Sequence, residues 1–129
     1  MFYVDTSAAA KLVLLERGSA ALRRWLEAHG EHLCSSDLLR IELQRAVRRA
    51  APEQMEQARM VLSTILLLRM STETCERAAR LEPTSLRSPD ALHLASAMDV
   101  GDELEGIVTY DERLAEAAQA NGIASISPR

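Results

Sequence analysis

Short apolar runs alternate with helical stretches along the whole chain, and no other feature restricts the fold as strongly. Amphipathic helical patterns occupy the intervals between the runs, which is typical of a parallel sheet covered by helices on both faces. The sequence therefore predicts an α/β fold, a three-layer α/β/α sandwich around a short, mostly parallel central sheet. Strands are expected at residues 2–4, 32–34, 66–70, 106–109 and 123–126.

The composition is that of an ordinary globular protein. The chain has 129 residues, 47% of them apolar and 26% charged, which suits one domain, residues 1–129, with its own core. It contains neither 18 consecutive apolar residues nor a basic segment leading an apolar one, so we expect a cytoplasmic protein with no membrane span. Cys34 and Cys75 show no metal-ligand spacing and are expected to be two buried thiols.

The basic residues are almost all arginines, and several of them lie close together at residues 40–49. The net charge of −4 argues against a protein that coats nucleic acid over its whole surface. Of fifteen basic residues only Lys11 is lysine, and the planar guanidinium of arginine favours two-point contacts with phosphate or carboxylate. A helix face in solvent, together with a codon bias that favours arginine, explains this pattern as well as a contact with RNA or a protein does. The candidate contact residues are Arg40, Arg45, Arg48, Arg49 and Arg87.

Three aspartates occupy positions that such a fold would bring together. Asp5 and Asp111 each follow a predicted strand, and the carboxyl ends of parallel strands form the edge where α/β sheets bind ligands. Asp90 lies in the first turn of a buried helix that Ser88–Pro89 is expected to begin. Asp90 alone also fits the simpler role of offsetting the helix dipole. His93, on the same helix, is expected to be structural, and a supporting role beside Asp90 stays open.

Glu42 is the anomaly of the third predicted helix. It falls inside the apolar stripe of that helix, which comprises Leu38, Leu39, Leu43 and Ala46. A carboxylate that points toward a core is costly unless it is paired, protonated or bound to a metal. An ion pair with Arg45, or a place at the rim of the stripe, is the structural alternative. A hard divalent cation would relieve the repulsion among four such acids and support phosphodiester hydrolysis.

These motifs resemble those of PIN-domain ribonucleases, and among them the VapC-type toxins of type II toxin–antitoxin systems. The resemblance rests on four stretches: the strand leading into Asp5-Thr6-Ser7, the helix signature from Ser36 to Glu42, P-D-A-L-H-L-A-S-A at 89–97 and I-V-T-Y-D-E-R-L at 107–114. It implies Mg²⁺ or Mn²⁺ as the cofactor. The implied metal ligands are Asp5, Glu42, Asp90 and Asp111, and the implied polar support is Thr6, Ser7 and Thr109.

The same resemblance implies an endoribonuclease toxin that cuts structured RNA, transfer or ribosomal, forms a homodimer and is inhibited by a cognate antitoxin. The apolar tracts at 11–15 and 60–68 suit a partner groove or dimer face, although core packing explains most of their residues equally well. An inactive PIN-fold binding module is the main alternative. A phosphoacceptor receiver domain fits less well because a late lysine is missing, and a dehalogenase-like phosphatase because Ser7 replaces its second aspartate.

Overall fold

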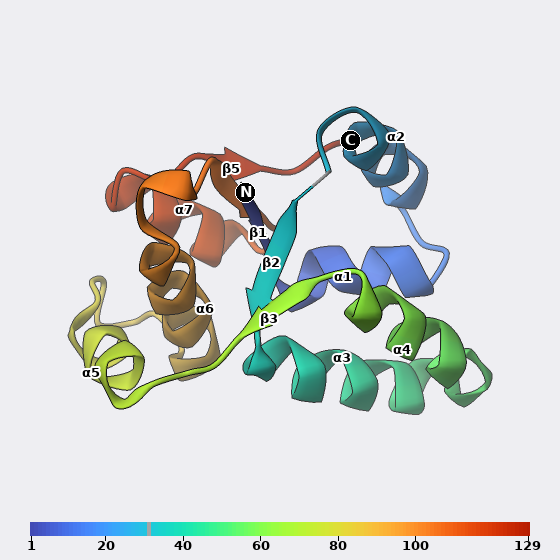
Figure 1. Cartoon of the computed structure of the whole chain (residues 1–129), viewed down its shortest axis with the longest axis horizontal. Helices are drawn as coiled ribbons and strands as arrows, with labels where there is room; N and C mark the ends of the chain where they lie inside the picture. Colours follow the sequence, from blue (N-terminus) through green and yellow to red (C-terminus); the bar gives the residue numbers. More distant parts are fainter. Residues whose placement is uncertain (31) are drawn as a thin grey trace.

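A parallel sheet forms the centre of the computed structural model, which describes residues 1–30 and 32–129. Within these residues the sheet has five strands in the order β3-β2-β1-β4-β5, and every pairing is parallel (Figure 1). The predicted fold class is therefore confirmed. The strands are β1 Phe2–Val4, β2 Leu33–Ser36, β3 Leu66–Leu68, β4 Gly106–Val108 and β5 Ser125–Ile126.

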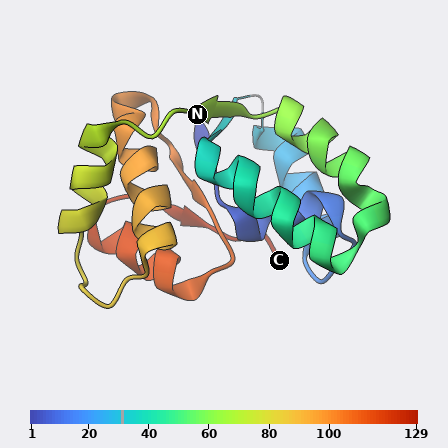
Figure 2. The ribbon, with the colours of Figure 1, turned by 90° about the horizontal axis from the view of Figure 1, so that it is seen from below.

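Helices cover the sheet as two groups, one on each face (Figures 1 and 2). The first group holds α1 Thr6–Val13, α2 Ser19–His29, α3 Asp37–Ala50 and α4 Met55–Ser63; the second holds α5 Thr72–Arg80, α6 Ser88–Asp99 and α7 Glu112–Ala120. Single 3₁₀ turns, η1 Pro52–Gln54 and η2 Gly101–Glu103, precede α4 and follow α6. In the described part of the chain, no helix is both long and apolar enough to cross a membrane.

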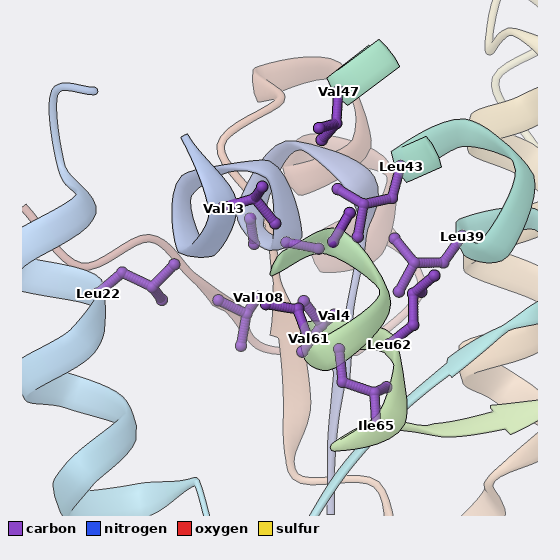
Figure 3. Close-up of a cluster of buried hydrophobic side chains, with 13 residues drawn as sticks. Val4, Val13, Leu22, Leu39, Leu43, Val47, Val61, Leu62, Ile65 and Val108 are labelled. Carbon is purple, nitrogen blue, oxygen red and sulfur yellow. The ribbon is translucent and has the colours of Figure 1, made fainter. Parts of the chain in front are cut away.

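The central strands supply two separate cores. Val4 and Val108 pack with side chains of α1, α3 and α4, which Figure 3 shows converging on one side of the sheet. Tyr3 and Ile107 pack instead with side chains of α6 and α7. Successive residues of a strand point to opposite faces, so a strand covered on both sides must be apolar throughout. This two-sided burial explains the unbroken apolar runs in the sequence.

The register of β1 against β4 positions the polar residues that follow these two strands. Val4 lies opposite Val108 in the parallel ladder. The next residues, Asp5 and Thr109, therefore leave the sheet side by side at its carboxyl edge. The backbone N–H of Asp5 continues the pairing by donating to the Val108 carbonyl at 3.2 Å.

Several predicted boundaries need correction. The helical pattern after Asp5 continues in the sequence through residues 8–16, which predicts a helix to residue 16, but α1 ends at Val13 because Leu14 has an extended backbone. The third strand ends at Leu68, two residues early, and the last strand contains only Ser125–Ile126. The helix carrying Asp90 begins at Ser88, so Ser88 is its first residue, and its N-cap position has no side-chain hydrogen bond.

The prediction of two buried thiols is wrong for one of them. Cys34 is buried in β2, but Cys75 is exposed on α5. The only buried side chain of α5 in this structure is Thr74, so that helix covers α6 with a narrow face and leaves its other sides in water. Cys75 lines a shallow surface hollow between α5 and α6.

We expect Leu43→Ala to lower the free energy of unfolding by about 2–5 kcal/mol, because Leu43 is completely buried between α3 and its neighbours. Ile41→Ala is the matched control on the same helix, since Ile41 is 55% exposed, and it should cost about 0.5 kcal/mol or less. Urea denaturation followed by circular dichroism measures both. Equal losses would contradict the assignment of the buried face of α3.

Candidate active site

The four predicted acids all lie around the carboxyl edge of the sheet, and we call them together the acidic edge. Asp5 follows β1 and is the N-cap of α1, and Asp111 follows β4 and is the N-cap of α7. Asp90 lies in the first turn of α6, and Glu42 lies in the second turn of α3. The acids thus come from four different elements, drawn from both helical layers.

Asp5 is the most deeply buried of these acids, with 4% of its surface exposed. Ser7 donates a hydrogen bond to its Oδ1 at 2.7 Å and Thr109 donates to its Oδ2 at 2.7 Å. The backbone N–H of Ala8 also donates to Oδ1, at 3.0 Å. Burial raises the pKa of the Asp5 carboxyl, although these hydrogen bonds act in the opposite direction. Two of the predicted supporting residues therefore fix the orientation of Asp5.

Asp90 is half-buried, and the charges of its neighbours act on it. Burial raises the pKa of its carboxyl first, and the negative charges of Asp111 and Asp5 raise it further. His93 and Arg87 oppose this shift. Two of the other acids are therefore close enough to Asp90 to disfavour its ionised form, in addition to its burial.

Glu42 lies at the rim of the apolar stripe of α3, whose buried members are Leu39, Leu43 and Val47. Its Oε1 accepts a hydrogen bond from the Thr6 hydroxyl at 2.7 Å and lies 2.7 Å from Nε2 of His93. Burial favours protonation, but the hydrogen bonds from His93 and Thr6 and the attraction of His93 outweigh it and lower the pKa of Glu42. The alternative ion pair with Arg45 is wrong. Among the described residues the ionic partner of Glu42 is His93, and Arg45 is exposed.

Sequence reasoning did not foresee the contacts of His93 and missed Tyr3. His93 is 2% exposed, and its Nδ1 lies 2.8 Å from the hydroxyl oxygen of the fully buried Tyr3, which lies 3.1 Å from the hydroxyl oxygen of Ser36. Because an ionised carboxylate only accepts, we assign the hydrogen on Nε2 to the bond with Glu42. The sequence did contain one sign that His93 belongs to the site: it follows Asp90 by three residues and therefore lies on the same helix face.

The predicted arginine contacts divide into two sets. Arg40, Arg45, Arg48 and Arg49 lie exposed along α3, and Arg40 is paired with Asp37 at 3.3 Å. Arg87 occupies the N-cap position of α6, and its charge lowers the pKa of Asp90. Of these arginines, only Arg87 has an electrostatic link to Asp90 in this structure. The contacts that the α3 arginines make with other molecules remain a prediction.

The side chains of the acidic edge do not by themselves form a closed metal cage. Among residues 1–30 and 32–129, no group of three or more His, Cys, Asp or Glu side chains is arranged to hold a metal ion. Mg²⁺ is usually bound through one or two carboxylates, keeps several waters and completes its shell with substrate phosphates. The carboxylates of the acidic edge offer only oxygen ligands, which Mg²⁺ prefers. They therefore fit such an ion, although the described residues alone form no complete cage.

Comparison with known proteins agrees with this fold. The PIN-domain model matches residues 2–120. The chain is 40% identical over 132 residues to ribonuclease VapC47 of Mycobacterium tuberculosis, with 99% of this chain and 97% of the relative covered. It is 38% identical over 126 residues to ribonuclease VapC46 of the same species, with 98% of this chain and 96% of the relative covered. The chain therefore belongs to the PIN-domain family, and these relatives within the family are VapC ribonucleases.

Solved structures support the same fold. Mycobacterium tuberculosis VapC20, described as a toxin that cleaves the sarcin–ricin loop, superposes with a TM-score of 0.80 at 16% identity, with 99% of this chain and 100% of that chain covered. A toxin–antitoxin complex from Klebsiella pneumoniae contains a chain with a TM-score of 0.77 at 24% identity, with 100% and 98% covered. At these identities the likeness establishes the shared architecture.

We expect Asp90→Asn to raise the melting temperature of the metal-free protein at pH 7, because it removes a carboxylate that burial and two acidic neighbours disfavour. A raised folded pKa means that the folded protein loses stability as the pH rises from about 4 through that pKa. The advantage of the variant should therefore shrink toward pH 4. Asp102→Asn, on the exposed turn η2, is the control for simple charge removal. An Asp90→Asn protein no more stable than its parent at pH 7 would refute the repulsion.

We expect Tyr3 and His93 to be energetically coupled through their hydrogen bond. His93→Ala should cost about 1–3 kcal/mol by removing a partner from buried polar groups, whereas His93→Gln, which keeps a donor, should cost less. A double-mutant cycle with Tyr3→Phe, measured by urea unfolding, should give a coupling energy of about 0.5–3 kcal/mol. Strict additivity of the two substitutions would show that this hydrogen bond contributes nothing.

Proposed function

We propose that this protein is a Mg²⁺- or Mn²⁺-dependent endoribonuclease toxin that hydrolyses phosphodiester bonds in structured RNA. Its membership of the PIN-domain family and its VapC ribonuclease relatives support the reaction class. The observation that carries the proposal is the placement of four acids from four elements at the ligand-binding edge of the sheet, where burial and the charges of Asp111 and Asp5 raise the pKa of Asp90. Transfer or ribosomal RNA is the substrate class we favour, and the description of VapC20 as a sarcin–ricin loop cleaving toxin supports it.

In this proposal Asp5 and Asp90 hold a divalent cation, and Glu42 and Asp111 position water or a second cation. When bound, such a cation lowers the pKa of a water molecule and neutralises charge on the phosphate that is attacked. The chain prepares the ligands, because Ser7 and Thr109 hold Asp5 and two donors hold a single oxygen of Glu42. The lowered pKa of Glu42 keeps it ionised near neutral pH, which is the form in which a carboxylate binds a cation.

We further propose that the toxin forms a homodimer and is inhibited by a cognate antitoxin protein. Large apolar side chains on the surface support a protein partner, since Leu15 is 86% exposed and Met60 is 59% exposed. Ile41 and Leu66 are exposed to a similar extent. The structural similarity to a toxin–antitoxin complex from Klebsiella pneumoniae supports the same idea. Some residues of both predicted apolar tracts therefore remain available at the surface.

We also propose that residues 1–129 act as one domain in the cytoplasm. The first and the last strand both join β4, so the two ends of the chain contribute to one sheet. The two free cysteines, one of them exposed, are compatible with a reducing compartment, where RNA substrates are also located.

Cleavage of total RNA by the purified, antitoxin-free protein tests the reaction. We expect discrete products with Mg²⁺ or Mn²⁺, none with EDTA, and a loss of about 100-fold or more for Asp5→Asn and for Asp90→Asn. Titration calorimetry with Mn²⁺ should show weaker binding for both variants. Asp102→Asn should match the parent in both measurements. A folded parent that binds Mn²⁺ but never cleaves RNA would favour the inactive binding module instead.

A further inference from the structure

A surface hollow of about 480 Å³ lies beside the acidic edge, on its α1 and α2 side. We call it the cationic hollow, and it is lined by Lys11, Arg17, Gly18, Tyr110 and Arg129. These residues come from α1, the turn before α2, the segment after β4 and the last residue of the chain. Figures 1 and 2 show the C-terminal end returning to the region of α1 and α2.

The cationic hollow is directly connected to the acidic edge. Tyr110 stands between Thr109 and Asp111, and its backbone N–H donates to the hydroxyl of Ser7 at 2.8 Å. The same Ser7 hydroxyl donates to Asp5. Lys11 follows Ser7 by four residues on α1, so their side chains are neighbours on one helix face. A polyanion that extends from the acidic edge in this direction therefore meets the cationic hollow next.

The charges around the cationic hollow are predominantly positive. Lys11 is held in place, because its Nζ donates to the Arg17 carbonyl at 2.7 Å and lies 4.6 Å from the centre of the Tyr110 ring. Glu16, 3.6 Å from the same Nζ, offsets one positive charge. The six ion pairs found in the described part of the chain involve neither Arg17 nor Arg129. Both of these residues are exposed, and Arg129 also lines an adjoining hollow that contains Asp111 and Glu112.

Contacts within the fold bring these cations together. The hydroxyl of Tyr110 donates to the Pro128 carbonyl at 2.7 Å, which holds the end of the chain against the ring and places Arg129 at the cationic hollow. Gly18 has a positive φ of 92°, and a Cβ at this position would lie 3.6 Å from the side chains of Lys11 and Tyr110. The turn that it forms directs the preceding Arg17 to the same place.

We propose that the cationic hollow is a phosphate subsite for the RNA strand, in which Arg17 and Arg129 bind a backbone phosphate adjacent to the one at the acidic edge. This inference rests on the proposed ribonuclease function. Repulsion from the carboxylates opposes the approach of RNA, so affinity must come from cations close by, and guanidinium groups suit phosphate oxygens. Direct connection to the acidic edge favours an RNA strand over an acidic protein segment as the occupant.

Binding of RNA in EDTA tests the subsite without requiring cleavage. The probe is a fluorescein-labelled single-stranded RNA of mixed sequence, and fluorescence anisotropy gives its affinity between 50 and 200 mM salt. We expect Arg17→Gln and Arg129→Gln each to weaken binding, and the double variant, which loses the contact to that one phosphate, to reduce the slope of log affinity against log salt by about 0.7. Arg24→Gln, at an exposed position of α2 outside the hollow, is the matched control and should leave the slope unchanged.

The possible outcomes separate this inference from the proposed function. A double variant with the slope of the parent, or a parent that does not bind the RNA, overturns the subsite. An unchanged RNA slope together with weaker binding of a glutamate-rich peptide would assign the hollow to an acidic protein segment. A reduced slope in a protein whose parent never cleaves RNA upholds the subsite and refutes only the ribonuclease function. Melting curves of each variant confirm that the substituted surface arginines leave the fold intact.

Discussion

The pairing of β1 with β4 is the constraint on which the candidate site depends. Because the two strands are parallel and in register at Val4 and Val108, the residues that follow both strands are neighbours without any long side chain reaching across. Thr109 donates a hydrogen bond to Asp5, and Asp111, two residues after Thr109, is the N-cap of α7. Were the register shifted by one residue, alternation would turn these side chains to the opposite face. Strand pairing thus sets the chemistry of this edge.

Electrostatic repulsion is built into the same edge. Folding brings Asp5 and Asp111 close enough to Asp90 to disfavour its ionised form, and burial of Asp5 adds to the cost. Glu42 is treated differently, since two donors stabilise its charge. The ionised forms of Asp5 and Asp90 are thus disfavoured, whereas the ionised form of Glu42 is stabilised. Such a difference between neighbouring acids is typical of sites where a ligand or a reaction restores the balance.

The sequence was sufficient for the features that depend on local pattern. Unbroken apolar runs revealed the strands, and Asp5 and Asp111 were recognisable because each follows a strand and caps the helix after it. The partner of Glu42 was beyond such reasoning, because His93 is 51 residues away and meets it only after α3 and α6 have packed. The exposure of Cys75 likewise depends on which face of α5 contacts α6. Pattern predicts elements, whereas tertiary packing decides partners.

The order of the strands has a consequence for how the protein is made. β4 lies between β1 and β5 in the sheet, yet it is one of the last elements to be synthesised. Until residue 108 has left the ribosome, β1 has a neighbour on one side only, and Asp5 lacks its bond from Thr109. Asp90 and the His93 that holds Glu42 also arrive late. A nascent chain therefore carries no assembled acidic edge until β4 has been synthesised.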